Sequence, residues 1–200
     1  MNFPILSFLI LLPSIGAFFL FFTKSSKATN ITVKYVALFT SLVNFFLSIY
    51  LWILFDQSTS EFQFVENRIW IENLINYKVG IDGISILFIV LTTFITPLCI
   101  ISVNNSVKNR LREFLIAILI MESFMIGVFC SLDLVFFYLF FESCFIPMFL
   151  IIGIWGGARR VYSAFKFFLF TLLGSVLMLV AIISIYWISG TTDVVQLYQL

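Results

Sequence analysis

The stretch "LDLVFFYLFFESCFIPMFLIIGIWG", Leu132–Gly156, decides the fold class of this chain. From Leu134 onward it is apolar over about 20 residues, the length that a helix needs to cross the hydrocarbon core of a bilayer. A single acid, Glu142, interrupts the apolar run. A carboxylate that faces lipid at mid-bilayer is costly, so this side chain must face protein or water. The stretch therefore predicts a membrane-spanning helix with an internal polar group.

The composition of the whole chain agrees with this interpretation. Of its 200 residues, 62% are hydrophobic and 10% are charged, whereas about 25% of the residues in soluble domains are charged. Six apolar segments have spanning length, and they cover residues 3–22, 31–55, 83–103, 111–131, 134–154 and 163–188. The sequence predicts an all-α membrane protein with six transmembrane helices.

Several classes of site lack the residues that they need. The chain has no histidine, and Cys99, Cys130 and Cys144 are widely spaced in apolar runs, as is typical of small buried hydrophobic residues. No glycine-rich phosphate-binding motif occurs, and the net charge is +1. We therefore expect no metal site, no cofactor bound by this chain and no nucleic-acid partner, with lipids as the surroundings.

The basic residues predict the orientation in the membrane. The three loops between alternate helices, with the adjoining helix ends, carry nine Lys and Arg residues, and the opposite side carries only Arg68 and Lys78. The nine are Lys24, Lys27, Lys34, Lys108, Arg110, Arg112, Arg159, Arg160 and Lys166. Basic loops stay on the cytoplasmic or matrix side, so the N-terminus is expected on the other, outer side. The first apolar run has spanning length and no basic segment before it, so we interpret it as a helix rather than a removable signal.

The segment from Asp56 to Asp82 is the one sizeable extramembrane piece. Apolar residues alternate at Phe62 and Phe64 and again at Ile69 and Ile71, which indicates a small β-hairpin or an interfacial patch on the outer face. Trp70 and Tyr77 are expected at headgroup level, and Asp82 is expected to cap the third helix. We divide the chain into residues 1–55 (two helices), 56–82 (outer loop) and 83–200 (four helices and a short tail).

Two acids fall inside predicted helices. Glu142 lies eight residues into its helix, about 12 Å from the outer side, and Glu122 lies eleven residues into its helix, about 16 Å from the inner side. Both are thus near the middle of a core about 30 Å thick. Each is a candidate for proton transfer or for a structural hydrogen bond, and the sequence leaves open whether the two face each other. Pro147 frees the carbonyl of Ser143 in the Glu142 helix, as internal prolines do beside transport paths.

One basic residue is a further candidate. Lys166 lies about a turn into the sixth predicted helix. Its long side chain either reaches back to the inner surface or serves an internal polar path. The sequence does not decide between these two positions.

Four stretches resemble one family closely. They are "FQFVE" (62–66), "GIDGISILF" (80–88), the opening stretch and "FFLFTLLGSVLMLVAI" (167–182). In this order and spacing they resemble chain 4 of the proton-translocating NADH–quinone oxidoreductase, respiratory complex I, of the mitochondrial type. The resemblance implies an antiporter-like, inverted-repeat fold of which this chain has the N-terminal part. It also implies a multi-pass, organelle-encoded protein of the mitochondrial inner membrane, with the N-terminus on the intermembrane-space side.

The resemblance also implies a function. The family belongs to an enzyme, the H⁺-translocating NADH:ubiquinone reductase, and contributes to proton translocation coupled to quinone reduction. NADH, FMN, the iron–sulfur clusters and ubiquinone are used by other subunits, and no redox chemistry takes place in this one. The family's glutamate on the fifth helix falls on Glu142 and is taken to modulate the protonation of a lysine on the seventh helix.

The chain departs from the family in its extent. It stops at Leu200, before the seventh helix, and Lys166 belongs to the sixth helix and is not the missing lysine. We expect a split subunit, in which a second polypeptide supplies the remaining helices beside other membrane-arm subunits, in preference to a truncated product. The alternatives for function are a chain of a related cation/proton antiporter and a scaffold piece that does not pump.

Overall fold

The computed structural model describes residues 4–23, 30–59, 61–71, 75–103, 107 and 109–198. Six helices in these ranges are long and apolar enough to cross a membrane. They are α1 (Ile5–Phe22), α2 (Asn30–Leu54), α3 (Ser85–Ser102), α4 (Leu111–Cys130), α5 (Leu134–Trp155) and α6 (Arg160–Ser189). The six predicted spans are therefore confirmed, and the largest difference at a helix end is the start of α6, three residues before the predicted one. Of the residues named above, Lys24, Lys27, Lys108 and Leu200 lie outside the described residues.

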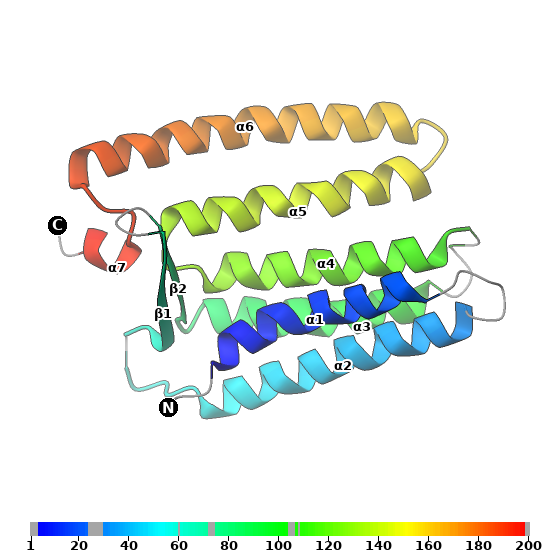
Figure 1. Ribbon diagram of the computed structural model, residues 1–200, viewed down its shortest axis with the longest axis horizontal. Helices are drawn as coiled ribbons and strands as arrows, with labels where there is room; N and C mark the ends of the chain where they lie inside the picture. Colours follow the sequence, from blue (N-terminus) through cyan, green and yellow to red (C-terminus); the bar gives the residue numbers. More distant parts are fainter. Residues whose placement is uncertain are drawn as a thin grey trace.

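The helices lie side by side as a bundle, with α4 at its centre (Figure 1). Helix α4 packs against α1, α2, α3 and α5, whereas α6 packs chiefly against α5. In the most apolar part of α4, half of the residues are buried. In the corresponding parts of α5 and α6 only 11% are buried. The core is thus formed by the first four helices, while α5 and α6 leave large apolar faces open.

A two-stranded antiparallel sheet closes one end of the bundle (Figure 1). Its strands are β1 (Gln63–Ile71) and β2 (Ile75–Ile81), paired with Arg68 opposite Tyr77 and with a register irregularity between Gln63 and Glu66. Phe64, inside that irregularity, has a positive φ of 53°, which interrupts the simple alternation expected from the sequence. The segment between α2 and α3 therefore contains a β-hairpin with a bulge.

The hairpin is packed onto the bundle. The side chains of Val79 and Ile81 are fully buried in a core cluster with residues of α1, α3 and α4. Tyr77 was expected at headgroup level, but its ring packs edge-on against Phe136 and its hydroxyl lies 2.6 Å from that of Ser7. The backbone of Trp70 belongs to β1. Its side chain, which was expected at headgroup level, lies outside the described part of the structure.

Acids at the hairpin end of the bundle cap the starts of α1 and α5. Glu66 accepts hydrogen bonds from the backbone N–H groups of Leu6 (2.9 Å) and Ser7 (3.3 Å) and from the Ser7 hydroxyl, so β1 supplies the first turn of α1 with a carboxylate. The Asp133 carboxylate accepts from the N–H groups of Val135 and Phe136 and starts α5. Free N–H groups at a helix start favour an anion, so these carboxylates stabilise the starts of α1 and α5.

Asp82 caps the third helix, as the sequence predicted. Its carboxylate accepts a hydrogen bond of 2.7 Å from the backbone N–H of Ser85. Burial raises the pKa of Asp82, but the hydrogen bonds from Ser85 and Ile84 outweigh this effect and hold the pKa below its ordinary value of 3.8.

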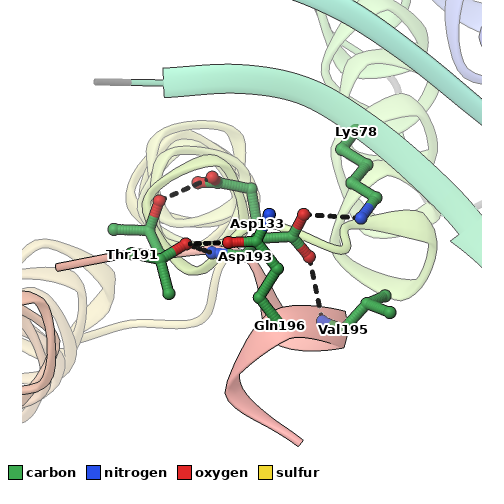
Figure 2. A network of polar contacts seen from close by, with 7 residues as sticks. Lys78, Asp133, Thr191, Asp193, Val195 and Gln196 are labelled. Carbon is green, nitrogen blue, oxygen red and sulfur yellow. Dashed lines mark hydrogen bonds and ion pairs between the residues drawn. The ribbon is translucent and has the colours of Figure 1, made fainter. Parts of the chain in front are cut away.

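A polar network joins the hairpin to the segment after α6 (Figure 2). The Lys78 ammonium of β2 lies 2.5 Å from the Asp193 carboxylate. Asp193 also caps the short helix α7 (Val194–Leu197) by accepting from the N–H of Val195. Thr192 donates its hydroxyl proton to Asp133 at 2.7 Å, and the backbones of Leu132 and Val194 are hydrogen-bonded. The segment after α6, which the sequence predicted only as a tail, is thus fixed to the start of α5 and to strand β2 of the hairpin.

Candidate functional site

Glu142 lies in the first half of α5, where the Asp133 cap fixes the start of the helix eight residues earlier. The residue is partly buried, and its Oε2 atom is shielded from solvent and has no hydrogen-bond partner in the part of the chain that the structure describes. Pro147 lies one turn further along, and the helix continues through it to Trp155. The mid-helix position predicted from the sequence is therefore what the structure has.

Aromatic rings occupy the helix around Glu142. Phe141 and Phe145 pack edge-to-face on α5, with ring centroids 5.0 Å apart, and Phe145 contacts Phe167 of α6. The ion pairs among the described residues are Lys78–Asp193 and Arg110–Glu113, both near helix ends. The part of the chain that the structure describes thus gives Glu142 an apolar setting and no cationic partner.

Glu122 is the more deeply buried acid. It lies in the middle of α4, and only 1% of its surface is exposed. The amide nitrogen of Asn44, on α2, donates a hydrogen bond of 2.9 Å to Glu122 Oε1. The other oxygen, Oε2, has no hydrogen-bond partner among the described residues, and neither has Asn44 Oδ1.

Asn44 belongs to a polar stripe that the sequence reasoning missed. Ser41, Asn44 and Ser48 are fully buried on one face of α2. Ser48 is 2.7 Å from the hydroxyl of Thr93, which is buried on α3. The spacing of three and four residues in an otherwise apolar helix was the available signal, since residues at that spacing share a helix face.

The two acids have different surroundings. Glu122 contacts α2 and lines a groove of about 550 Å³ between α3 and α4, to which Thr92, Thr96 and Met121 also contribute. Glu142 lies on α5, where the neighbouring side chains Phe141 and Phe145 make aromatic contacts within α5 and with Phe167 of α6. In the described structure no polar contact joins them, so the structure brings Glu122 to Asn44 and not to Glu142.

Lys166 is an exposed residue of α6. It makes no hydrogen bond or ion pair with any described residue, and the face of α6 on which it lies is open in this chain. The two positions that the sequence left open for its side chain, the inner surface and an internal polar path, both remain predictions.

A second polar line runs along α1. Ser14 donates to Ser123 at 2.8 Å, and Ser123 in turn donates to the backbone carbonyl of Ile10. A cavity of about 500 Å³ connects this pair with Ser7 and Tyr77 at the hairpin. The hydroxyls line the cavity from the hairpin end of the bundle to Ser123, the residue that follows Glu122 on α4.

The described residues offer no ready metal centre. They contain no group of three or more His, Cys, Asp or Glu side chains that are close enough to share an ion. Cys99, Cys130 and Cys144 are all free thiols. The chemistry that this arrangement can support is therefore proton binding and hydrogen bonding by buried carboxyl groups.

Comparisons with known proteins agree with the resemblance of the four stretches. A family model described as "NADH:quinone oxidoreductase/Mrp antiporter, TM" matches residues 131–200. NADH-quinone oxidoreductase subunit M of Rhodobacter capsulatus is 56% identical over 173 residues, which are 86% of this chain and 33% of that protein. NADH-ubiquinone oxidoreductase chain 4 of Marchantia polymorpha is 48% identical over 94% of this chain and 38% of that protein.

Two solved structures share the fold of this chain. A chain of respiratory complex I from Thermus thermophilus with bound NADH is 26% identical and superposes with a TM-score of 0.78 over 94% of this chain and 38% of that chain. The membrane-bound sulfane sulfur reductase, an archaeal respiratory membrane complex, shares the fold with a TM-score of 0.82 at 18% identity. The chain thus spans between a third and two fifths of the length of these relatives.

Proposed function

We propose, on the premise that this chain is homologous to the N-terminal part of chain 4 (subunit M) of NADH:quinone oxidoreductase, that it contributes to proton translocation coupled to quinone reduction. Its place is the membrane arm of that complex, beside other membrane-arm subunits. NADH, FMN, iron–sulfur clusters and ubiquinone then belong to other subunits, and this chain supplies protonatable groups.

The position and surroundings of Glu142 carry the proposal. The side chain is a carboxylate within a helix of spanning length, with one oxygen that is shielded and has no hydrogen-bond partner among the described residues, and with Pro147 about one turn away. A carboxylate that is partly shielded from water among phenylalanines is costly, and a role that needs a proton accounts best for its presence there. In the proposed role Glu142 gains and loses a proton and its charge modulates a lysine of the remaining helices. Glu122 and Lys166 are lesser candidates for the same path.

The remaining helices are proposed as the partner of this chain. The relatives are more than twice as long as the part that matches, and the open faces of α5 and α6 are where further helices would pack. We expect those helices to carry the lysine, on a second polypeptide or in a longer chain. The mitochondrial inner membrane is the proposed location, because chain 4 relatives from Marchantia polymorpha and Arabidopsis thaliana match.

A substitution of Glu142 tests the proposal. Glu142→Gln preserves the shape of the side chain and removes its charge, so the complex should assemble normally but lose most of its quinone-coupled proton pumping. Pumping is measured in sealed membrane vesicles, together with the amount of assembled complex. Glu113→Gln, at an exposed site on α4, is the matched control and should pump normally. Wild-type pumping by Glu142→Gln would contradict the proposed role and favour a scaffold.

A related cation/proton antiporter is the second candidate function. It is favoured by the description of the family model, which covers Mrp antiporters as well as NADH:quinone oxidoreductase. The proteins that co-purify with the chain separate the two candidates. NADH-oxidising subunits among them support the first function, whereas antiporter chains alone support the second.

A further inference from the structure

Two buried oxygen atoms on neighbouring helices lack a hydrogen-bond donor among the described residues. They are Glu122 Oε2 and Asn44 Oδ1, and each is shielded from solvent without a partner in the described structure. Their two side chains are already joined by one hydrogen bond, from Asn44 Nδ2 to Glu122 Oε1. An acid and a primary amide that are linked in this way have room for one more proton between their remaining oxygens.

An ionised Glu122 fits these surroundings poorly. A buried carboxylate requires several donors or a cation, and this one has a single neutral donor. The basic residues of the two helices that are nearest in sequence to the pair are Lys34 on α2 and Arg112 on α4. Each lies ten residues away, about 15 Å along its helix. The side chain of Lys34 donates to the carbonyl of Ile101, and a nitrogen of Arg112 donates to that of Thr23.

A neutral Glu122 gives a hydrogen bond to both of the atoms that lack a partner, Glu122 Oε2 and Asn44 Oδ1. With a proton on Oε2, its O–H can donate to Asn44 Oδ1 while Asn44 Nδ2 continues to donate to Oε1. Every acceptor in the pair then has a donor, and no charge is buried. Loss of that proton would leave an anion and two unpaired oxygens in the core.

We propose that Glu122 and Asn44 form a buried binding site for a single proton, held as a cyclic acid–amide pair between α4 and α2. The site is separate from Glu142, which lies on α5 and makes no polar contact with it. The inference stands on the geometry of this pair and does not depend on the proposed role of Glu142.

The groove between α3 and α4 gives this site a route for exchange. Glu122 lines it together with Thr92 and Thr96, and its volume of about 550 Å³ is large enough for several water molecules. Its other lining residues are mainly apolar, among them Phe88, Phe129 and Met125. Water that enters from the groove can accept the proton of Glu122 and stabilise the anion, whereas a dry groove keeps the proton bound.

Infrared spectroscopy of the purified chain, with the subunits that co-purify, tests the protonation state. In spectra taken at neutral pH, Glu122→Gln should remove one carbonyl band of a neutral carboxylic acid and leave the carboxylate bands unchanged. Glutamine also preserves the fold, because an amide–amide pair with Asn44 satisfies the same atoms. Glu142→Gln is the control, and the band assigned to Glu122 should persist in that variant.

A change at Asn44 tests the pairing itself. In Asn44→Leu the acid loses both hydrogen bonds, so the Glu122 band should move to higher frequency. This result also decides the matter if Glu122→Gln fails to fold. The proposal is overturned if Glu122→Gln removes carboxylate bands instead, or if Asn44→Leu leaves the band in place. It is overturned equally if the neutral-acid band appears only after sodium is withdrawn, since the site would then bind a metal cation.

Discussion

At the scale of single residues, Asp82 links the charge of one carboxylate to the start of α3. Its pKa lies below 3.8, chiefly through the hydrogen bonds from Ser85 that oppose the effect of burial. A group with a lowered pKa in the folded state adds stability above its unfolded pKa, and this stability is lost as the pH falls through the folded value. We expect acidification from neutral pH to below 3.8 to cost about 0.5 kcal/mol through this residue, a small amount because the site is partly exposed and screened.

Asp82→Asn isolates that contribution. Asparagine keeps an oxygen to accept from the Ser85 N–H but does not titrate, so the variant should lose less stability on acidification than the wild type. Thermal unfolding in detergent at both pH values gives the comparison, and Glu61→Gln, at an exposed acid with no described helix cap, should follow the wild type. Equal pH dependence of Asp82→Asn and the wild type would show that the cap does not depend on charge.

The positions of the candidate residues along their helices could be predicted from the sequence, but their partners could not. Glu142 and Glu122 were assigned to the middle of their helices by counting residues at a fixed rise. Asn44 lies 78 residues before Glu122 and meets it only because α2 packs against α4. Such a contact depends on how the helices rotate about their axes, and the hydrophobic pattern says little about rotation when nearly every face is apolar.

At the scale of elements, the Lys78–Asp193 ion pair fixes β2 to the start of α7. The side chains are 14% and 11% exposed and 2.5 Å apart, so the pair is shielded from water more than a surface ion pair. In Lys78→Met the Asp193 carboxylate keeps its cap on Val195 but loses its cation. We expect a loss of about 2 kcal/mol in the free energy of unfolding, as for hydrogen bonds to charged groups. Denaturant titration of the purified chain measures the loss.

The pairing can be separated from the loss of a positive charge. Arg68→Gln removes an exposed cation from β1, the other strand of the hairpin, and should change stability little. In a double-mutant cycle, Asp193→Asn should cost much less when Lys78 is already methionine. Additive costs would mean that the two side chains act independently and that the contact adds no stability of its own.

Element types followed from the sequence more closely than the connections between elements. Long apolar runs fix the helices, because each must satisfy its own backbone hydrogen bonds in hydrocarbon. The hairpin was indicated by alternation, yet its bulge at Phe64 and the short helix α7 were not. Both depend on contacts with distant residues: β2 and Glu66 pack onto α1 and α4, and α7 is held by Lys78.

At the scale of the whole molecule, charge divides the two ends of the bundle. Among the described residues, the hairpin end has acids that cap helices and only Arg68 and Lys78 as bases. The opposite end has Arg110 and Arg112 at the start of α4 and Arg159 and Arg160 at the start of α6. Basic residues remain on the side from which a membrane protein inserts. We therefore expect the hairpin to face the outer side and the α5–α6 turn to face the matrix or cytoplasm.

Single introduced cysteines test this orientation. Ser58 follows α2 at the hairpin end, Ala158 lies in the α5–α6 turn, and both are exposed. In sealed vesicles with the outer face outward, a membrane-impermeant maleimide should label Ser58→Cys at once and Ala158→Cys only after the membrane is permeabilised. The unaltered chain is the control for Cys99, Cys130 and Cys144, which lie within helices. The opposite pattern would reverse the orientation, and labelling of both cysteines before permeabilisation would show that the two ends are not separated by a bilayer.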